Sequence, residues 1–175
     1  LVNKDNKIPD DYKASLVEYE GHLVDSSIAS SLDKMFKSAK KDGINLKINT
    51  AYRDRNEQQE IYERRVKAYI KKGNTKEQAI ARTNSEVQKP GYSEHETGLA
   101  LDFSNPERPE ENSSMWKWLE NNSYKYGFVL RYPKDKTDIT KVANEEWHYR
   151  YVGKDIAKEM KITGKCLEEY VNNLL

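Results

Sequence analysis

The stretch Gly98–Phe103 alternates small or polar residues with large apolar ones. Successive side chains of a β-strand point to opposite faces, so the three large residues are predicted to face a core. Gly98, Ala100 and Asp102 then share the other face, where the small pair leaves space beside a rigidly mounted carboxylate. The chain is therefore expected to fold around a sheet with one buried face and a polar cleft on the other.

The rest of the chain predicts a mixture of helices and short strands. Apolar spacing, caps and breakers predict helices over residues 26–42, 56–72, 75–87 and 115–122, followed by two C-terminal helices around Ile156 and Val171. Alternating residues predict strands over 44–51, 99–103, 127–132 and 147–152. Residues 1–21 show no sustained periodicity and are expected to form an extended lead-in that wraps the domain.

Composition limits the class of protein but does not identify a binding partner. The chain has 175 residues, which fits one domain, and its 30 basic and 29 acidic residues leave a net charge of +1. This balance gives no electrostatic footprint for nucleic acid, and no apolar run is long enough to cross a bilayer. The single cysteine, Cys166, excludes an internal disulfide and is expected to be an inert thiol.

Potential metal ligands gather in two separated segments. In residues 93–102, His95 and Asp102 offer one nitrogen and one carboxylate ligand. In residues 144–151, His148 completes a His/Asp/His set and Glu145 stands beside it. Three protein ligands leave a coordination position for water, which is the arrangement of a catalytic zinc site.

The less specific interpretation of each residue is structural. A single histidine is more often a core or surface side chain than a ligand, although two of the three histidines fall inside these clusters. The third, His22, has no suggestive partner and is expected to be structural. Glu94, Glu96 and Glu146 are explained equally well as solvent-facing residues, and no catalytic role is assigned to them.

These segments together resemble the VanY-type zinc D-alanyl-D-alanine carboxypeptidases, which are related to D-Ala-D-Ala dipeptidases. The family pattern S-x-H-x-x-G-x-A-x-D is met at all five fixed positions of residues 93–102, and E-x-W-H is met by residues 145–148, with Glu146 where the family usually has proline. The resemblance implies that Zn²⁺ is held by His95, Asp102 and His148, with Glu145 as the catalytic base.

A third match concerns the substrate. Tyr52-Arg53 followed by Gln58 resembles the family's Y-R-S segment with its downstream glutamine, with Asp54 in place of serine. A guanidinium can bind both oxygens of the free carboxylate that a carboxypeptidase must recognise, so Arg53 is the expected substrate anchor. The residues that the resemblance places around the substrate are Arg53, Gln58, Ser93, Tyr132 and Trp147.

The resemblance further implies an α+β fold, of the hedgehog/D,D-peptidase type, in which a small and mostly antiparallel sheet carries the zinc site and helices pack against it. Residues 1–175 are expected to form a single zinc carboxypeptidase domain. The expected function is hydrolysis of the C-terminal D-Ala from peptidoglycan stem peptides. The alternatives are an L,D-carboxypeptidase acting on tetrapeptide stems and a non-catalytic zinc-containing module that binds cell wall.

Such substrates imply that the protein acts outside the cytoplasm, in the cell envelope. It is expected to be a monomer. Its full-length form is expected to be secreted or held at the membrane by an anchor absent from this chain. Under this reading, zinc lowers the pKa of its water and polarises the scissile carbonyl, while Glu145 moves protons from water to the leaving amine.

Overall fold

Short strands alternate with helices in the computed structural model, which describes residues 1–174. The strands are β1 (Leu16–Tyr19), β2 (His22–Asp25), β3 (Ile48–Thr50), β4 (Ala100–Phe103), β5 (Phe128–Leu130) and β6 (His148–Tyr151). The α-helices are α1 (Ser26–Lys41), α2 (Arg55–Lys71), α3 (Lys76–Asn84), α4 (Asn112–Asn122), α5 (Thr137–Thr140), α6 (Lys154–Thr163) and α7 (Leu167–Asn172). Short 3₁₀ helices include η1 (Glu94–Thr97), which leads into β4.

An antiparallel sheet with the strand order β3-β4-β6-β5 is the centre of the fold. In its middle pair, Asp102 of β4 lies opposite His148 of β6. Strands β1 and β2 form a separate antiparallel hairpin. The α+β class with a small antiparallel sheet is therefore confirmed.

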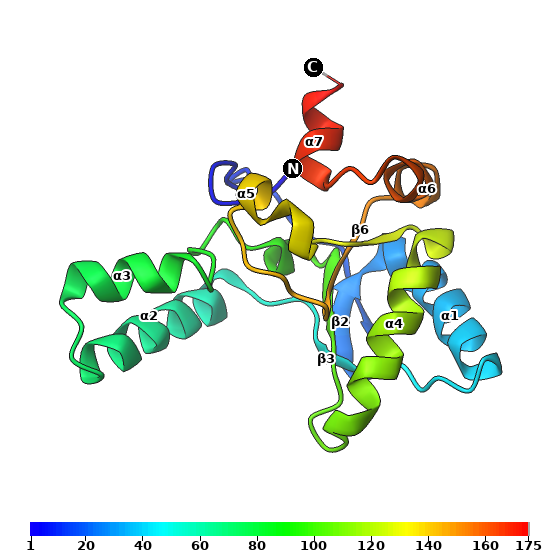
Figure 1. Ribbon diagram of the computed structural model, residues 1–175, viewed down its shortest axis with the longest axis horizontal. Coiled ribbons are helices and arrows are strands. Elements are labelled where there is room, and N and C mark those ends of the chain that lie inside the picture. Colours follow the sequence, from blue (N-terminus) through cyan, green and yellow to red (C-terminus); the bar gives the residue numbers. More distant parts are fainter. Residues whose placement is uncertain (175) are drawn as a thin grey trace.

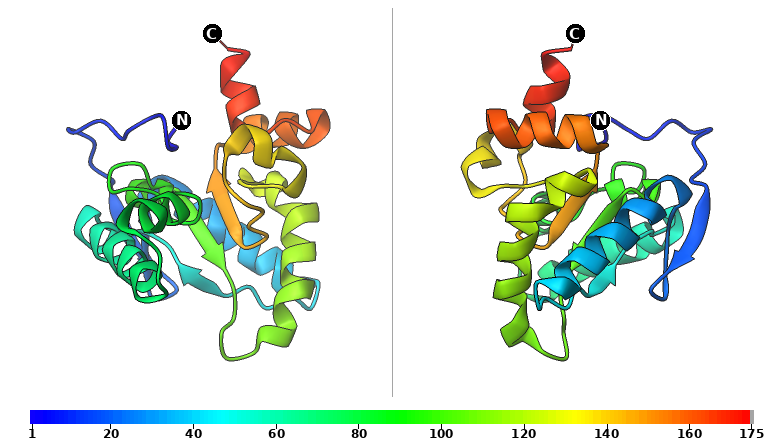
Figure 2. Two further views of the ribbon diagram at one scale, coloured as in Figure 1. Left: turned by 60° about the vertical axis from the view of Figure 1, so that its left-hand side comes forward. Right: turned by 90° about the vertical axis from the view of Figure 1, so that its right-hand side faces the viewer.

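Helices α1 and α4 cover one face of this sheet (Figures 1 and 2). The strand alternation expected around residue 101 is present, because Leu101 and Phe103 are fully buried in the core. Asp102 is on the opposite face of β4, and His148 precedes the core residue Tyr149 on β6 in the same way. The α1/α4 core thus fixes one face of the sheet and leaves the other for the polar cluster.

Helices α2 and α3 form a hairpin that projects sideways from the sheet (Figure 1). Both helices begin with a capping box, Asp54 with Glu57 in α2 and Thr75 with Gln78 in α3. Thr75 stands at the start of the helix predicted from residue 75, and Asp54, which stands where the family has serine, caps α2. Gln58 is the one buried residue of α2 and lies where the hairpin meets the sheet.

The structure corrects several expected boundaries. Part of the segment expected to be an extended lead-in forms the β1–β2 hairpin. Its turn places Glu20 at φ 48°, a conformation that non-glycine residues rarely adopt, so the sequence did not predict the turn. The strand expected over residues 44–51 pairs only as β3, and α3 ends at Asn84 rather than near residue 87. Short elements η1 and α5 were not expected, because single turns carry too little periodicity.

Replacing Gly98 with alanine is expected to lower the free energy of unfolding by about 2–4 kcal/mol. Gly98 has φ +71°, and a Cβ there would lie 2.8 Å from the backbone nitrogen of Asp25. Gly73→Ala is the matched control, because φ is +89° but nothing lies within 4 Å. Urea unfolding of both variants separates the clash from the backbone strain, and equal losses would contradict a clash at Gly98.

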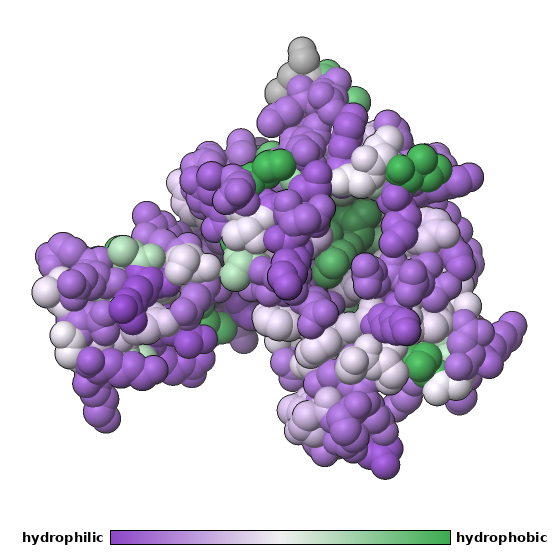
Figure 3. All heavy atoms as spheres, viewed as in Figure 1, coloured by the Kyte–Doolittle hydropathy of each residue, from purple (hydrophilic) through white to green (hydrophobic). Residues whose placement is uncertain are grey.

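The surface is strongly hydrophilic in the view of Figure 3, with small and scattered hydrophobic patches. This agrees with the 34% of charged residues. Among the helices of residues 1–174, none combines the length and the apolar character that a membrane crossing requires.

Candidate metal centre and active site

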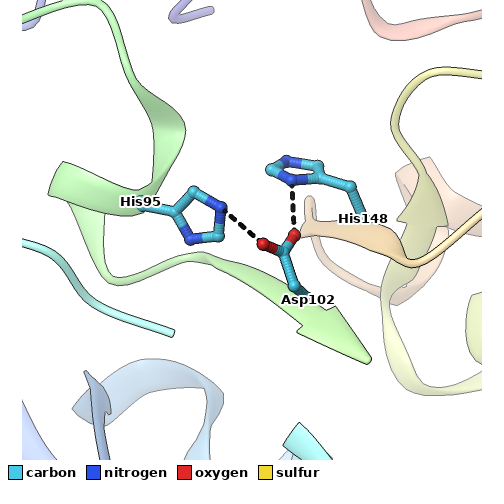
Figure 4. Close-up of side chains that lie close together, drawn as sticks. All are labelled: His95, Asp102 and His148. Atoms are coloured by element: carbon cyan, nitrogen blue, oxygen red, sulfur yellow. Dashed lines mark hydrogen bonds and ion pairs between the residues drawn. The ribbon is translucent and has the colours of Figure 1, made fainter. Parts of the chain in front are cut away.

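Three side chains from three elements converge on the face of the sheet opposite the α1/α4 core (Figure 4). His95 comes from η1, Asp102 from β4 and His148 from β6. Nε2 of His95 lies 3.4 Å from one carboxylate oxygen of Asp102, and Nδ1 of His148 lies 2.9 Å from the other. One ligand atom from each residue can be chosen so that all three lie within 4.8 Å of one another.

This donor set fits a zinc ion. Zinc bonds of about 2.0–2.2 Å to nitrogen and oxygen place tetrahedral ligand atoms about 3.3 Å apart, close to the spacing found here. Nδ1 of His95 is 2.8 Å from the carbonyl oxygen of Ala51, to which it donates, and this leaves Nε2 with its lone pair toward Asp102. Both histidines are only 5% exposed, so the nitrogens are held in fixed directions.

Asp102 is held in the ionised form that a metal ligand needs. Burial alone would raise the pKa of this carboxyl, but the imidazoles of His95 and His148 hold the pKa well below its ordinary value. Its position opposite His148 in the β4–β6 ladder fixes the pair through backbone hydrogen bonds.

Glu145 lies beside the three ligands without belonging to the closest group. One of its carboxylate oxygens is 3.8 Å from Nδ1 of His148. Burial raises the pKa of Glu145 to about 7, the charge of Asp102 adding to the effect and that of His148 opposing it. A carboxyl group with a pKa near neutrality both accepts and releases a proton readily, which is the property required of a general base that later acts as an acid.

A cavity of about 240 Å³ opens in front of these groups. The site residues expected from the sequence all line it: Arg53, Gln58, Ser93, His95, Asp102, Tyr132, Glu145, Trp147 and His148. The fold thus brings segments that are nearly a hundred residues apart in the chain to one cavity. Ile61 of α2 and the segment that follows α3, with Val87 and Gln88, supply a further wall.

Arg53 is fixed at one side of the cavity. Its backbone N–H donates to the carbonyl oxygen of His95, at 3.2 Å. Its Nη1 donates to Oε1 of Gln58 at 2.7 Å, and Nε2 of Gln58 donates to the carbonyl oxygen of Gln88 at 2.6 Å. Gln58 is 1% exposed, so it braces the guanidinium, whose remaining N–H groups are available to a ligand.

The remaining expected residues have different surroundings. Ser93 is buried at the start of η1, and its side chain makes no capping hydrogen bond. The buried ring of Tyr132 lies 5.0 Å, between centroids, from the ring of His148. Trp147 is half-exposed and packs against Trp116, with ring centroids 6.1 Å apart.

Glu94 is the residue of this site that the sequence interpretation missed. It was treated as solvent-facing, as was Glu96, but the two are 2% and 8% exposed. The 3₁₀ turn of η1 folds Glu94 inward, where one of its carboxylate oxygens lies 3.5 Å from Nε2 of His148. Glu146 is exposed, as expected. No spacing rule separates the three glutamates; the only available signal was the position of Glu94 directly before a candidate ligand.

These features define a metallopeptidase-like site on an α+β fold, and comparison with known proteins identifies the family. The family model for VanY, D-alanyl-D-alanine carboxypeptidase, matches residues 21–154. A D-alanyl-D-alanine carboxypeptidase of Enterococcus faecalis is 42% identical over 173 residues, which is 98% of this chain and 65% of the relative. The chain belongs to the VanY D-alanyl-D-alanine carboxypeptidase family.

Solved structures agree with this assignment. A glutamate-to-alanine mutant of the D,D-pentapeptidase VanY of the VanB-type resistance cassette, in complex with Zn(II), superposes with a TM-score of 0.91 at 42% identity, covering 98% of this chain and 97% of that one. VanYB in complex with D-alanine-D-alanine gives 0.93 at 42% identity, covering 98% and 96%. The LD-carboxypeptidase LdcB gives 0.83 at 35% identity, covering 98% and 84%.

Proposed function

We propose that this chain is a zinc-dependent D-alanyl-D-alanine carboxypeptidase that hydrolyses the C-terminal D-Ala from peptidoglycan stem peptides. The observation that carries this proposal is one cavity that holds a His/Asp/His ligand set, a glutamate with a pKa near 7 and a braced arginine. The chain spans 65% of the length of the Enterococcus faecalis relative, and residues 1–175 are proposed to act as a single catalytic domain.

Each residue has a distinct task in this proposal. A zinc ion held by His95, Asp102 and His148 supplies activated water and polarises the scissile carbonyl. Glu145 accepts a proton from the attacking water and passes it to the leaving amine, for which a pKa near neutrality is suited.

The other residues recognise the chain end. Arg53 donates hydrogen bonds to the terminal carboxylate, while Gln58 keeps the guanidinium in place. Ser93, Tyr132 and Trp147 line the same cavity and are proposed to contact the peptide. The similarity to a VanYB structure containing D-alanine-D-alanine supports this substrate.

Stem peptides of two lengths test the function. Metal-replete protein is incubated with a pentapeptide ending in D-Ala-D-Ala or with a tetrapeptide ending in a single D-Ala, and released alanine is measured by mass spectrometry. A chelated sample is the control. Release from the pentapeptide that stops on chelation supports the proposal. Zinc binding without release from either peptide would instead indicate a cell-wall-binding module.

A second candidate is an L,D-carboxypeptidase acting on tetrapeptide stems. The similarity to LdcB across 98% of this chain favours including it, and the ligand motifs are compatible with both activities. Release from the tetrapeptide alone would decide for this candidate.

Replacing Arg53 with methionine is expected to reduce kcat/KM for the free-acid pentapeptide by about 10- to 150-fold, since hydrogen bonds to charged groups contribute about 1.5–3 kcal/mol. The same pentapeptide with an amidated C-terminus is expected to be cleaved slowly by the wild type. Its kcat/KM should change little in the variant, because it lacks the negative charge that Arg53 is proposed to recognise. The exposed Arg64 of α2, replaced in the same way, is the matched control. An equal loss of kcat/KM on both substrates would show that Arg53 does not bind the terminal carboxylate.

The substrate also sets the proposed partners and location. Peptidoglycan stem peptides or their precursors lie outside the cytoplasmic membrane, so we place the activity in the cell envelope. The chain is proposed to work as a monomer.

A further inference from the structure

His148 is held from both sides of its ring. Nδ1 faces Asp102 at 2.9 Å, and Nε2 faces Oε2 of Glu94 at 3.5 Å. Within residues 1–174, Nε2 of His148 and Oε2 of Glu94 are both buried without a hydrogen-bond partner, and they face each other across this 3.5 Å gap. When a metal takes Nδ1, the proton of the neutral ring is on Nε2, where the carboxylate of Glu94 is placed to accept it.

Glu94 is itself fixed by a buried ionic cluster. Its Oε1 accepts a hydrogen bond from Nε of Arg131 at 2.8 Å and lies 3.2 Å from Nη1 of Arg150. The guanidinium of Arg131 then donates two hydrogen bonds to Glu168, of 2.8 and 2.6 Å. Two arginines and two glutamates leave the cluster neutral, so Glu94 stays ionised although it is buried.

The cluster connects the metal centre to both ends of the described chain. Glu168 belongs to α7, and it also accepts a hydrogen bond from the side chain of Asn3, at 3.1 Å. The ribbon views show the N-terminal segment and α7 on the same side of the molecule (Figures 1 and 2). Helix α7 is therefore tied to His148 through Glu168, Arg131 and Glu94.

The arrangement is better explained by orientation than by stability or direct catalysis. A buried ion cluster gives little net stability compared with apolar residues of the same size, because its charges lose their hydration. Glu94 also lies on the Nε2 side of the ring, whereas the three ligand atoms converge on the Nδ1 side. It is therefore poorly placed to be a fourth ligand or to replace Glu145 as the base.

We propose that Glu94 is a positioning residue that orients His148 for zinc, and that Arg131 and α7 hold Glu94 in place. This inference rests on the zinc site of the proposed function. Loss of such a partner typically weakens metal affinity by about 10- to 100-fold. Glu168 is two contacts further from the ring than Glu94, so its replacement is expected to have a smaller effect.

The test measures zinc affinity by competition with a chromogenic chelator in Glu94→Ala, Glu94→Gln and wild-type protein. We expect a loss of about 10- to 100-fold for Glu94→Ala. Glu94→Gln keeps the size of the side chain but has a single oxygen for both Arg131 and Nε2 of His148, so it is expected to lose zinc affinity as well. Glu96→Gln is the matched control, because Glu96 is a buried glutamate of the same turn that bonds to Arg55 and Gly91 instead of His148. Its affinity should equal that of the wild type.

A further readout separates orientation from general stability. The visible spectrum of the Co²⁺-substituted protein should change in Glu94→Ala and stay unchanged in Glu96→Gln. If Glu94→Ala does not fold, the same measurements on Glu168→Gln decide, with a smaller loss of zinc affinity expected.

The outcomes distinguish this inference from the proposed function. A wild-type protein that binds no zinc would overturn both. A wild-type protein that binds zinc, with folded Glu94→Ala binding equally well and keeping the same Co²⁺ spectrum, would overturn only the role of Glu94. Equal zinc losses in Glu94→Ala and Glu96→Gln would also overturn it, since the effect would then belong to the turn as a whole.

Discussion

Glu145→Ala is expected to reduce kcat for D-Ala release by about 10²- to 10⁴-fold while the protein keeps one equivalent of zinc. The reason is the division of tasks at the site. The proposed ligand group is His95, Asp102 and His148, whereas Glu145 stands 3.8 Å from Nδ1 of His148 with a pKa raised by burial to about 7. Removing it takes away the proton carrier and leaves the ligands in place.

The measurement combines steady-state kinetics on the pentapeptide with metal analysis after dialysis. Glu146→Ala is the matched control, because it removes the neighbouring glutamate, which is exposed and does not line the cavity. Wild-type turnover in Glu145→Ala would refute the assigned base. Loss of zinc together with turnover would instead make Glu145 part of the metal site.

Much of the site was predictable because its residues lie on elements with strong local signals. The alternation around Asp102 predicts the strand β4 and its buried face, and the structure places Leu101 and Phe103 in the core as expected. Two motifs then name the candidate ligands, and antiparallel pairing of β4 with β6 places Asp102 opposite His148. Local pattern and family resemblance point to the same cavity.

What the sequence did not predict depends on contacts between distant segments. The inward direction of Glu94 follows from one 3₁₀ turn, and its burial is compensated by Arg131, 37 residues away, and then by Glu168. Gln58 was expected among the substrate-binding residues and does line the cavity, but its burial between Arg53 and the carbonyl of Gln88 was not predicted. Neither arrangement leaves a periodic trace, because each is decided by tertiary packing.

His148→Ala is expected to weaken zinc binding by more than about 100-fold, since changes in outer-shell partners alone cost about 10- to 100-fold. The variant loses one of three protein ligands and also removes the closest partner of Asp102, at 2.9 Å. Stabilisation by zinc should disappear with affinity, because a ligand that binds only the folded state raises its stability by RT ln(1 + [L]/Kd), which falls toward zero as Kd rises. Thermal unfolding with and without zinc measures this directly.

His22→Ala is the control that the composition offers, because His22 is the one histidine outside the ligand group and lies in β2. It should keep both zinc affinity and the zinc-dependent rise in Tm. His148→Ala removes a buried side chain as well as a ligand, so the metal-free forms of all three proteins must be compared first. A folded His148→Ala that binds zinc as tightly as His22→Ala would exclude the His/Asp/His centre. Loss of zinc affinity in His148→Ala but not in His22→Ala would show that zinc binds at the Asp102–His148 pair of β4 and β6, on which the proposed hydrolysis depends.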